Sequence, residues 1–393
     1  MAAFSGDDSR IASPGRVATI GALNFATVAV YSDLYITQPI LPLLSREFHV
    51  APATAGLTIS VVVLMIALVS SGYGSLSDAV GRKPVMVTSC VLLAVPTLLC
   101  ALATTFHMLL FFRALQGLLM PGVTAVAVAF IGDYFSEADL GPKVGGWIAA
   151  SVAGGLTGRV LSGLLAAWTN WRVPFVFFGL LTLVGAAAIA RGLPAGQGIA
   201  GVRLGSAYRG MFTHFRNRRL IGAFIIGGGV FFSFIGVFTY LPYYLTAPPF
   251  HLSTALVSSV YLVYIAGVFT SLVSGRLSRR FGRRPVMAAG LAIASAGVLG
   301  TLVHSLSAIV LSLVVLCVGM FTVQSTAPAF VNANARGAKG AAGSLYVTFY
   351  YVGASLGSAL PGYAWQAWGW PGVAASCVAA LLVGLAADGV LCG

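Results

Sequence analysis

Long runs without a charged residue dominate the second half of the chain. No Asp, Glu, Lys or Arg occurs in three segments, at residues 220–275, 285–335 and 340–387. A helix that crosses a bilayer needs about 20 mostly apolar residues, so each segment has room for two crossings. Turn-forming residues stand inside each segment, in TAPPFHLS at 246–253, HSLS at 304–307 and WGWPG at 368–372. The pattern predicts six membrane-spanning helices here.

The first half of the chain has the same density of apolar segments. It predicts six further spans, at residues 17–42, 53–75, 84–104, 108–131, 145–167 and 173–190. These segments are apolar on every side, whereas the strands of a membrane barrel alternate apolar and polar residues over about ten positions. We therefore predict an all-α integral membrane protein with 12 transmembrane helices.

Basic residues concentrate in alternate loops of this predicted topology. If the N-terminus is inside the cell, 18 of the 22 Lys and Arg residues fall in cytoplasmic segments, and only Arg46 and Arg172 fall in outer loops. Because basic loops stay on the cytoplasmic side of a membrane, both termini are expected to be cytoplasmic.

The composition agrees with a membrane protein. Hydrophobic residues make up 58% of the chain and charged residues 8%, against about 25% charged residues in soluble domains. The net charge of +13 does not indicate nucleic-acid binding, because the basic residues lie between apolar runs and no known binding motif occurs. The chain also lacks zinc, phosphate-loop and nucleophile motifs. We expect no enzyme, catalytic residue, metal or cofactor, and an ion or solute gradient as the energy source.

The two halves of the sequence repeat each other at an offset near 200 residues. The matching positions are Gly74, Gly81, Arg82 and Pro84 with Gly275, Gly282, Arg283 and Pro285, and Gly154, Gly158 and Gly163 with Gly353, Gly357 and Gly362. Parallel repeats of this kind are related by an axis along the membrane normal. The predicted domains are a six-helix bundle at 1–190, a cytoplasmic linker at 191–219 and a second six-helix bundle at 220–393. The glycine spacing favours close contact between spans that move against each other.

Three motifs in the first half of the chain match sequence patterns of a known protein family. The loop GSLSDAVGRK at 74–83 has the pattern G-x-L-x-D-x-x-G-R-K, and Arg113 and Gly117 fit R-x-x-x-G. The segment GGLTGRVLSG at 154–163 keeps part of an exporter glycine motif but lacks its proline. With these motifs the chain resembles the twelve-helix drug and sugar efflux branch of the major facilitator superfamily.

The resemblance implies a secondary transporter that works by alternating access. It would export a small organic compound, such as a drug, a sugar or a siderophore-like metabolite, in exchange for protons, as a monomer in the bacterial inner membrane. The loop residues Gly74, Asp78, Gly81, Arg82 and Lys83 are predicted to act in gating. Asp78 would pair with Arg82 or lie near the start of the eleventh span, where a helix N-terminus favours negative charge.

Only three charged residues lie within the predicted spans: Asp33, Arg113 and Arg159. Such residues are costly in a membrane and usually functional. We hypothesise that Asp33 faces one or both arginines across a central cavity and carries the coupling proton, so that its protonation frees the arginines for substrate. The alternatives are a static ion pair or helix cap at Asp33, and an Arg113 side chain that extends to the membrane surface.

Polar and aromatic residues on the expected cavity helices complete the predicted substrate site. They are Tyr31, Tyr35, Gln38, Gln116, Tyr240, Tyr264, Gln324 and Tyr350, beside Arg113 and Arg159. Aromatic faces with a few hydrogen-bonding groups suit a medium-sized organic ligand. The two arginines would also suit uptake or exchange of a small organic anion. A sensor or scaffold is not favoured, because it would need a large soluble segment.

Overall fold

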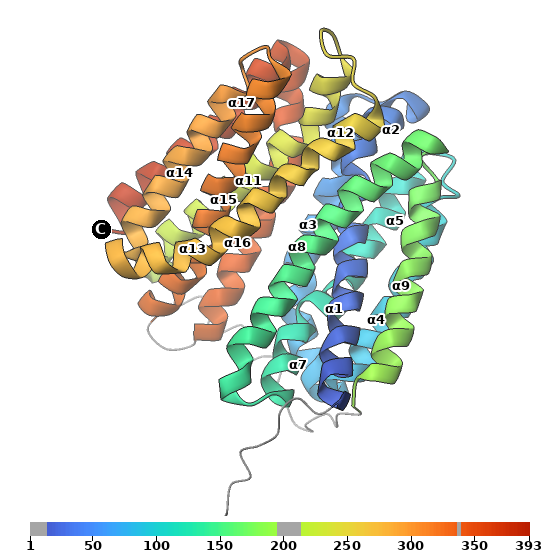
Figure 1. Ribbon diagram of the computed structural model, residues 1–393, viewed down its shortest axis with the longest axis vertical. Helices are drawn as coiled ribbons and strands as arrows, with labels where there is room; N and C mark the ends of the chain where they lie inside the picture. Colours follow the sequence, from blue (N-terminus) through green and yellow to red (C-terminus); the bar gives the residue numbers. More distant parts are fainter. Residues whose placement is uncertain (1–13, 195–213, 336–338) are drawn as a thin grey trace, which may run out of the picture.

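The computed structural model describes residues 14–194, 214–335 and 339–393. Nearly all of this part of the chain is helical, and it contains no strand. The helices form two groups that meet toward one end of the molecule and diverge toward the other (Figure 1). The expected all-α architecture in two halves is confirmed.

The first group of helices runs from α1 to α9. Its elements are α1 (Pro14–Tyr35), η1 (Gln38–Ile40), α2 (Leu41–Phe48), α3 (Pro52–Val80), α4 (Arg82–Cys100), α5 (Phe106–Leu119), α6 (Pro121–Thr124), α7 (Val126–Tyr134), α8 (Glu137–Trp168) and α9 (Val173–Gly192). The second group contains η2 (His214–Arg216), α11 (Arg218–Thr246), α12 (Thr254–Val260), η3 (Tyr261–Val263), α13 (Tyr264–Phe281), α14 (Arg283–Gly300), α15 (Leu306–Asn334), α16 (Lys339–Ala359) and α17 (Pro361–Leu391). Most of the predicted linker lies outside the described residues, so the domain boundaries stay a prediction.

Capping residues explain where several helices begin. Proline occupies the first helical turn of α2, α3, α6, α9 and α17, where no backbone N–H is needed. The side chains of Thr105 and Ser253 accept hydrogen bonds from backbone N–H groups at the starts of α5 and α12. The reversal inside α17 occurs at Gly369, whose φ of 61° suits glycine. This reversal lies in the WGWPG segment that the sequence marked as a turn.

Within the described residues, ten helical segments are long and apolar enough to cross a membrane. Four of them are interrupted: Val17–Phe48, Phe106–Tyr134, Thr254–Phe281 and, at Gly369, Pro361–Leu391. The helices α14 and α16 stand where the sequence predicts the ninth and eleventh spans but are not among these ten. The total of 12 and the orientation in the membrane therefore stay predictions.

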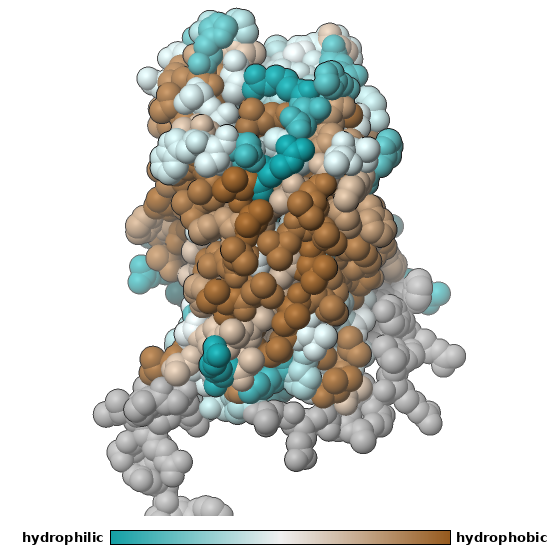
Figure 2. All heavy atoms as spheres, turned by 90° about the vertical axis from the view of Figure 1, so that its right-hand side faces the viewer, coloured by the Kyte–Doolittle hydropathy of each residue, from teal (hydrophilic) through white to brown (hydrophobic). Residues whose placement is uncertain are grey.

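The two ends of the molecule differ in chemistry. We call the end that carries the turns at Gly81 and Gly282 the basic end, and the end that carries Trp168, Trp365 and Trp368 the aromatic end. Between them, a broad apolar band separates two more hydrophilic ends on the face in Figure 2. Large apolar side chains remain exposed on several helices, including Leu68, Leu180, Phe269, Leu311 and Val383. This distribution fits contact with lipid.

The repeated glycines allow helices within each half to approach closely. A side chain at Gly154 or Gly158 of α8 would meet the backbone of α1 at Val28 or Ser32. At the equivalent positions, Gly353 and Gly357 of α16 lie against the backbone of α11 at residues 228 and 232. These four glycines therefore hold each half together, and the expectation that they lie between moving spans is wrong for them.

The third glycine of each set lies between the halves. Gly163 packs against Ser258 of α12, and Gly362 packs against Ala53 of α3. Hydrogen bonds join the halves in the same region, from Ser60 to Ser355 and between Ser45 and Tyr243. All of these contacts lie toward the aromatic end. The halves are therefore closed there, while α7 and α8 stand apart from α13 and α16 at the basic end (Figure 1).

Candidate functional site

Arg159 lies in the interior of α8, at the junction of the two halves. Its Nε donates to Oε1 of Gln38 over 2.5 Å, and its Nη1 donates to the carbonyl of Gly155 over 2.8 Å. The guanidinium carbon is 3.5 Å from the ring centroid of Tyr35 and 4.6 Å from that of Tyr264. Tyr264 belongs to the second half, so this buried cation is held by aromatic faces from both halves.

Two broken helices bring these partners to the arginine. α1 ends at Tyr35, and η1 follows at Gln38 and Pro39, where proline disfavours a continuous helix. Gln38 then donates through Nε2 to the hydroxyl of Thr239 on α11, over 3.2 Å. In the second half, the break at η3 places Tyr264 at the start of α13. Breaks of this kind near mid-membrane are typical of transporter substrate sites.

Aromatic residues of α16 and α11 extend the site. The ring of Tyr350 stacks on Phe231 with a centroid separation of 3.7 Å, and its hydroxyl accepts a 2.9 Å hydrogen bond from Nε2 of Gln324. From the first half, the Tyr31 hydroxyl faces that of Tyr351. Tyr31 also packs edge-on against Trp147, with ring centroids 6.4 Å apart.

Several buried polar atoms in this region have no hydrogen-bond partner within the described chain. They are Oδ1 of Asn24, Nε1 of Trp147 and the hydroxyls of Tyr264 and Tyr346. Unsatisfied polar groups are rare in native interiors because each costs free energy. The site can therefore offer a bound ligand several hydrogen bonds in addition to the charge of Arg159.

The carboxyl group of Asp33 forms no ion pair with either arginine among the described residues. The carboxyl group is fully buried, and its Oδ2 accepts hydrogen bonds from Thr182 at 2.9 Å and Thr97 at 3.4 Å. These partners lie on α9 and α4, inside the first half. The ion pairs among the described residues do not include Asp33. The hypothesis of one acid facing two arginines is wrong for Arg159, which binds Gln38 and Tyr35 instead. Arg113 lies in the same bundle as Asp33 and near its carboxyl group, but it donates to the Asp33 backbone carbonyl.

Arg113 is a structural clamp in this structure. It is fully buried, so it does not extend to the membrane surface. Its nitrogens donate to the carbonyls of Asp33, Leu34 and Thr58 over 2.8–2.9 Å. The first two carbonyls belong to the last turn of α1, which has no further helical N–H to bind them. The expected contact between Arg113 and substrate is not supported.

Gln116 and Tyr240 also serve packing. Gln116 accepts from Arg113 over 2.7 Å and donates to Thr97 over 2.7 Å, which joins the clamp to the threonine beside Asp33. Tyr240 is fully buried, and its hydroxyl donates to the carbonyl of Ser358 over 2.8 Å. Both side chains are satisfied by the protein, so neither is placed as a substrate contact.

The loop motif lies at the basic end and makes its contacts within the first half. Arg82 pairs with Asp78 at 2.5 Å and with Asp133 of α7 at 2.9 Å. Lys83 donates to the carbonyl of Leu193 over 2.6 Å, just after α9. Gly81 has a φ of 107° and forms the turn between α3 and α4. A Cβ added to Gly74 would meet nothing within 4 Å.

The pairing of Asp78 with Arg82 matches one of the two expected alternatives. The equivalent positions of the second copy, Arg279 and Arg283, are exposed. Asp133 itself has Asn334 as its counterpart at the repeat offset. The three-residue charge cluster therefore exists in the first half alone.

Several residues of the site and its surroundings escaped sequence reasoning. Trp147 and Tyr351 line the site, yet each looked like an ordinary apolar residue of a span. Asp388 of α17 is also buried and pairs with Arg284 at 3.2 Å, although no buried acid was expected in the second half. It lies one residue beyond a charge-free run, so the count of charge-free residues missed it.

Comparisons with known proteins agree with this architecture. The family model described as Major Facilitator Superfamily matches residues 23–358 and 250–391. The inner membrane transport protein YnfM of Escherichia coli K12 is 36% identical over 92% of this chain and 88% of its own length. The MFS-type transporter YybF of Bacillus subtilis 168 is 33% identical over 94% of this chain and 91% of its own length.

Solved transporter structures share the fold at low sequence identity. A bacterial homologue of the human lysosomal transporter Spinster, solved in an inward-facing and unoccupied conformation, superimposes with a TM-score of 0.79 at 17% identity, over 97% of this chain and 95% of that one. The nucleoside transporter NupG gives a TM-score of 0.78 at 14% identity, over 95% of this chain and 98% of that one.

Proposed function

Because the chain belongs to the Major Facilitator Superfamily, we propose that it exports a small organic compound across a bacterial inner membrane in exchange for protons. The observation that carries this proposal is the Arg159 cluster. It combines a buried cation, aromatic faces from both halves and unpaired hydrogen-bonding groups near mid-membrane. Such a set would bind a compound with an aromatic or other planar apolar body and one acidic or polar group.

The position of the contacts between the halves supports alternating access. In the present conformation the aromatic ends are joined and the basic ends are apart, so substrate would reach Arg159 from the basic end. With the basic end in the cytoplasm, this state would load a compound for export. Opening the aromatic end would break the contacts between α3 and α16 and between α2 and α11.

Proton coupling would act through the last turn of α1. Asp33 and Tyr35 share this turn, Arg113 binds its carbonyls, and Tyr35 supports the Arg159 guanidinium. Burial disfavours a charged carboxylate, whereas hydroxyl donors favour it. Gain or loss of a proton at Asp33 would change its hydrogen bonds to Thr97 and Thr182 and shift the end of α1. The shift would move Tyr35 and so change the position of the Arg159 guanidinium.

Uptake or exchange of a small organic anion is the second candidate. It is favoured by one observation: Arg159 is 2% exposed, and the ion pairs of the described residues do not include it. A buried cation without an acidic partner is costly, and an anionic substrate would neutralise it.

Transport in liposomes tests both candidates. Purified protein would be reconstituted, and movement of labelled aromatic acids, sugars and cationic drugs would be followed with and without a pH gradient. We expect transport of one class against its gradient when protons flow the other way. Asp33→Asn should retain exchange but lose the response to pH, and Arg159→Gln should lose both.

Arg172→Gln is the matched control, because this arginine is partly exposed and pairs with Glu47 at 3.1 Å, away from the cluster. Exchange of anions that ignores the pH gradient would favour the second candidate. Export by Asp33→Asn that still follows the pH gradient would remove Asp33 from the mechanism.

A further inference from the structure

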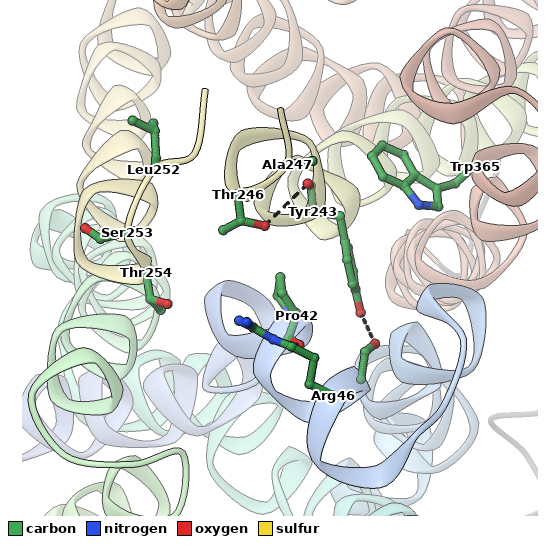
Figure 3. A pocket seen from close by; sticks show the side chains of 10 residues that line it. Pro42, Arg46, Tyr243, Thr246, Ala247, Leu252, Ser253, Thr254 and Trp365 are labelled. Atoms are coloured by element: carbon green, nitrogen blue, oxygen red, sulfur yellow. Dashed lines mark hydrogen bonds between the residues drawn. The ribbon is translucent and has the colours of Figure 1, made fainter. Parts of the chain in front are cut away.

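A pocket opens at the aromatic end, and the Arg159 cluster contributes none of its lining residues. Its volume is about 490 Å³, within the range of sites for small organic molecules. Ser45 and Arg46 come from α2 of the first half, whereas Tyr243, Thr246, Thr254 and Trp365 come from the second half. Figure 3 shows the labelled side chains around one hollow, with Arg46 reaching from α2 toward Thr254 and with Trp365 on another side of the hollow.

Arg46 gives the pocket a positive charge that no acid neutralises within the described chain. Its Nε donates to the carbonyl of Pro42 over 3.3 Å. The adjacent acid, Glu47, pairs with Arg172 instead, at 3.1 Å. The other ion pairs of the described residues lie at the basic end. The guanidinium therefore remains available for a ligand.

The rest of the lining suits an apolar body with polar edges. Trp365 and Tyr243 present aromatic surface, with ring centroids 6.1 Å apart. Thr246, Ser253 and Thr254 also line the pocket, although the Thr246 hydroxyl donates to a carbonyl of its own helix and the Ser253 hydroxyl caps α12. A carboxylate or sulfonate could bind Arg46 through two parallel hydrogen bonds while an attached ring packs on the aromatic wall.

The pocket depends on the closed state of the aromatic end. Its two walls belong to different halves, and the hydroxyls of Ser45 and Tyr243 join these halves 2.6 Å apart (Figure 3). If the halves separated here, Arg46 would move away from Thr254 and Trp365. A ligand that binds both walls must therefore favour the closed state, since it interacts better with that state.

We propose that this pocket is a regulatory site for small amphipathic organic anions that arrive from the solution at the aromatic end. Occupancy holds the two halves together and slows transport. The site differs from the Arg159 cluster in its residues, its end of the molecule and the side from which it fills.

Binding of 1-naphthalenesulfonate to the full-length protein in lipid nanodiscs tests the site. Calorimetry should show saturable binding, and Arg46→Gln should weaken it about tenfold or more, as expected for loss of a charge-assisted pair. Trp365→Leu should also weaken it. Arg159→Gln, which changes the central cluster, should remove at most a separate binding component there and leave the component that depends on Arg46 unchanged.

Conformational linkage gives a second test. Ser60 and Ser355 lie outside the pocket, and a disulfide between Ser60→Cys and Ser355→Cys would hold the aromatic end closed. The oxidised double variant should bind 1-naphthalenesulfonate at least as tightly as the reduced one. In oriented liposomes, the compound should slow transport by the wild type from the aromatic side and leave Arg46→Gln unaffected.

Three results would overturn the proposal. They are absence of binding at millimolar 1-naphthalenesulfonate, unchanged affinity in Arg46→Gln, and loss of binding in Arg159→Gln. The last result would place the compound in the central cluster instead. Weaker binding in the oxidised double variant would likewise contradict the link to the closed state.

Discussion

Arg113 and Arg159 are both buried in the first half, but their surroundings differ. Arg113 donates to three backbone carbonyls and to Gln116, all within its own bundle. Arg159 lies flat on Tyr35 and reaches aromatic groups of the opposite half. The first arrangement fixes the end of α1, and the second leaves a cation where two moving bodies meet.

Replacing Arg113 by Met should destabilise the protein. The change leaves the carbonyls of Asp33, Leu34 and Thr58 without their donor, at a cost of about 2–5 kcal/mol. The apparent melting temperature in detergent should fall clearly, and ligand affinity of the folded fraction should change little. A stable Arg113→Met variant that no longer binds substrate would instead show that Arg113 contacts the substrate.

Replacing Arg159 by Lys should weaken substrate binding and leave stability nearly unchanged, the opposite of the effect at Arg113. The ammonium keeps the charge but loses the planar group that stacks on Tyr35 and binds Gln38. We expect substrate affinity to fall about tenfold or more, with a melting temperature near that of the wild type. Equilibrium binding of the substrate identified in liposomes measures this. Affinity equal to the wild type would show that the planar guanidinium does not bind the substrate.

At the scale of helices, the glycines of α8 show which positions need a small residue. Gly158 lies against the backbone of Ser32 on α1, whereas a side chain at Gly145 would meet nothing within 4 Å. Both positions are in the same helix, so helix propensity alone cannot separate them.

Substitution of these two glycines by alanine should give opposite results. Gly158→Ala forces α1 away from α8 and should cost about 1–3 kcal/mol. Gly145→Ala should be neutral or stabilise by up to about 1 kcal/mol, because alanine favours the helix. Thermal unfolding in detergent compares the pair. Equal melting temperatures would contradict the close contact between α1 and α8.

The charge cluster at the basic end ties α3, α4 and α7 together. Asp78→Asn should remove one of the two ion pairs of Arg82 and leave its ion pair with Asp133 intact. Because both carboxylates are partly exposed, the loss of stability should be below about 1 kcal/mol. Transport should slow without a change in substrate preference, which a comparison of rates for several substrates measures. An altered preference would contradict a gating role.

At the scale of the whole molecule, closure of the aromatic end rests on a few side chains. The Ser60 and Ser355 hydroxyl oxygens are 2.7 Å apart on helices of different halves. The five native cysteines form no disulfide, whereas cysteines at positions 60 and 355 would stand next to each other and could pair.

A disulfide between Ser60→Cys and Ser355→Cys should stop transport. It would hold the aromatic end closed, and reduction should restore activity. Each single cysteine variant is the control, and both should remain active under the same oxidant. Full transport by the double variant with the disulfide formed would contradict alternating access through this contact.

The helical spans and much of the Arg159 cluster were predictable from the sequence, whereas the direction of each polar side chain was not. Gln38 and Tyr264 were found because polar residues and tyrosines stand out in apolar spans, and both contact Arg159 or its ring partners. Tyr240 stood out in the same way, yet its hydroxyl is bound to backbone. Trp147 gave no signal because aromatic residues are common along every span, and Tyr351 was passed over in favour of its neighbour Tyr350.

The sequence by itself determined that this chain lies in a membrane as two repeated bundles. Lipid contact demands apolar residues along the full length of each helix, and duplication leaves matching glycines and loops. Only the tertiary structure decided which way each polar residue points. The helix α1 is apolar on nearly every side, so no periodicity shows that Asp33 turns toward α4 and α9 while Tyr35 turns toward Arg159.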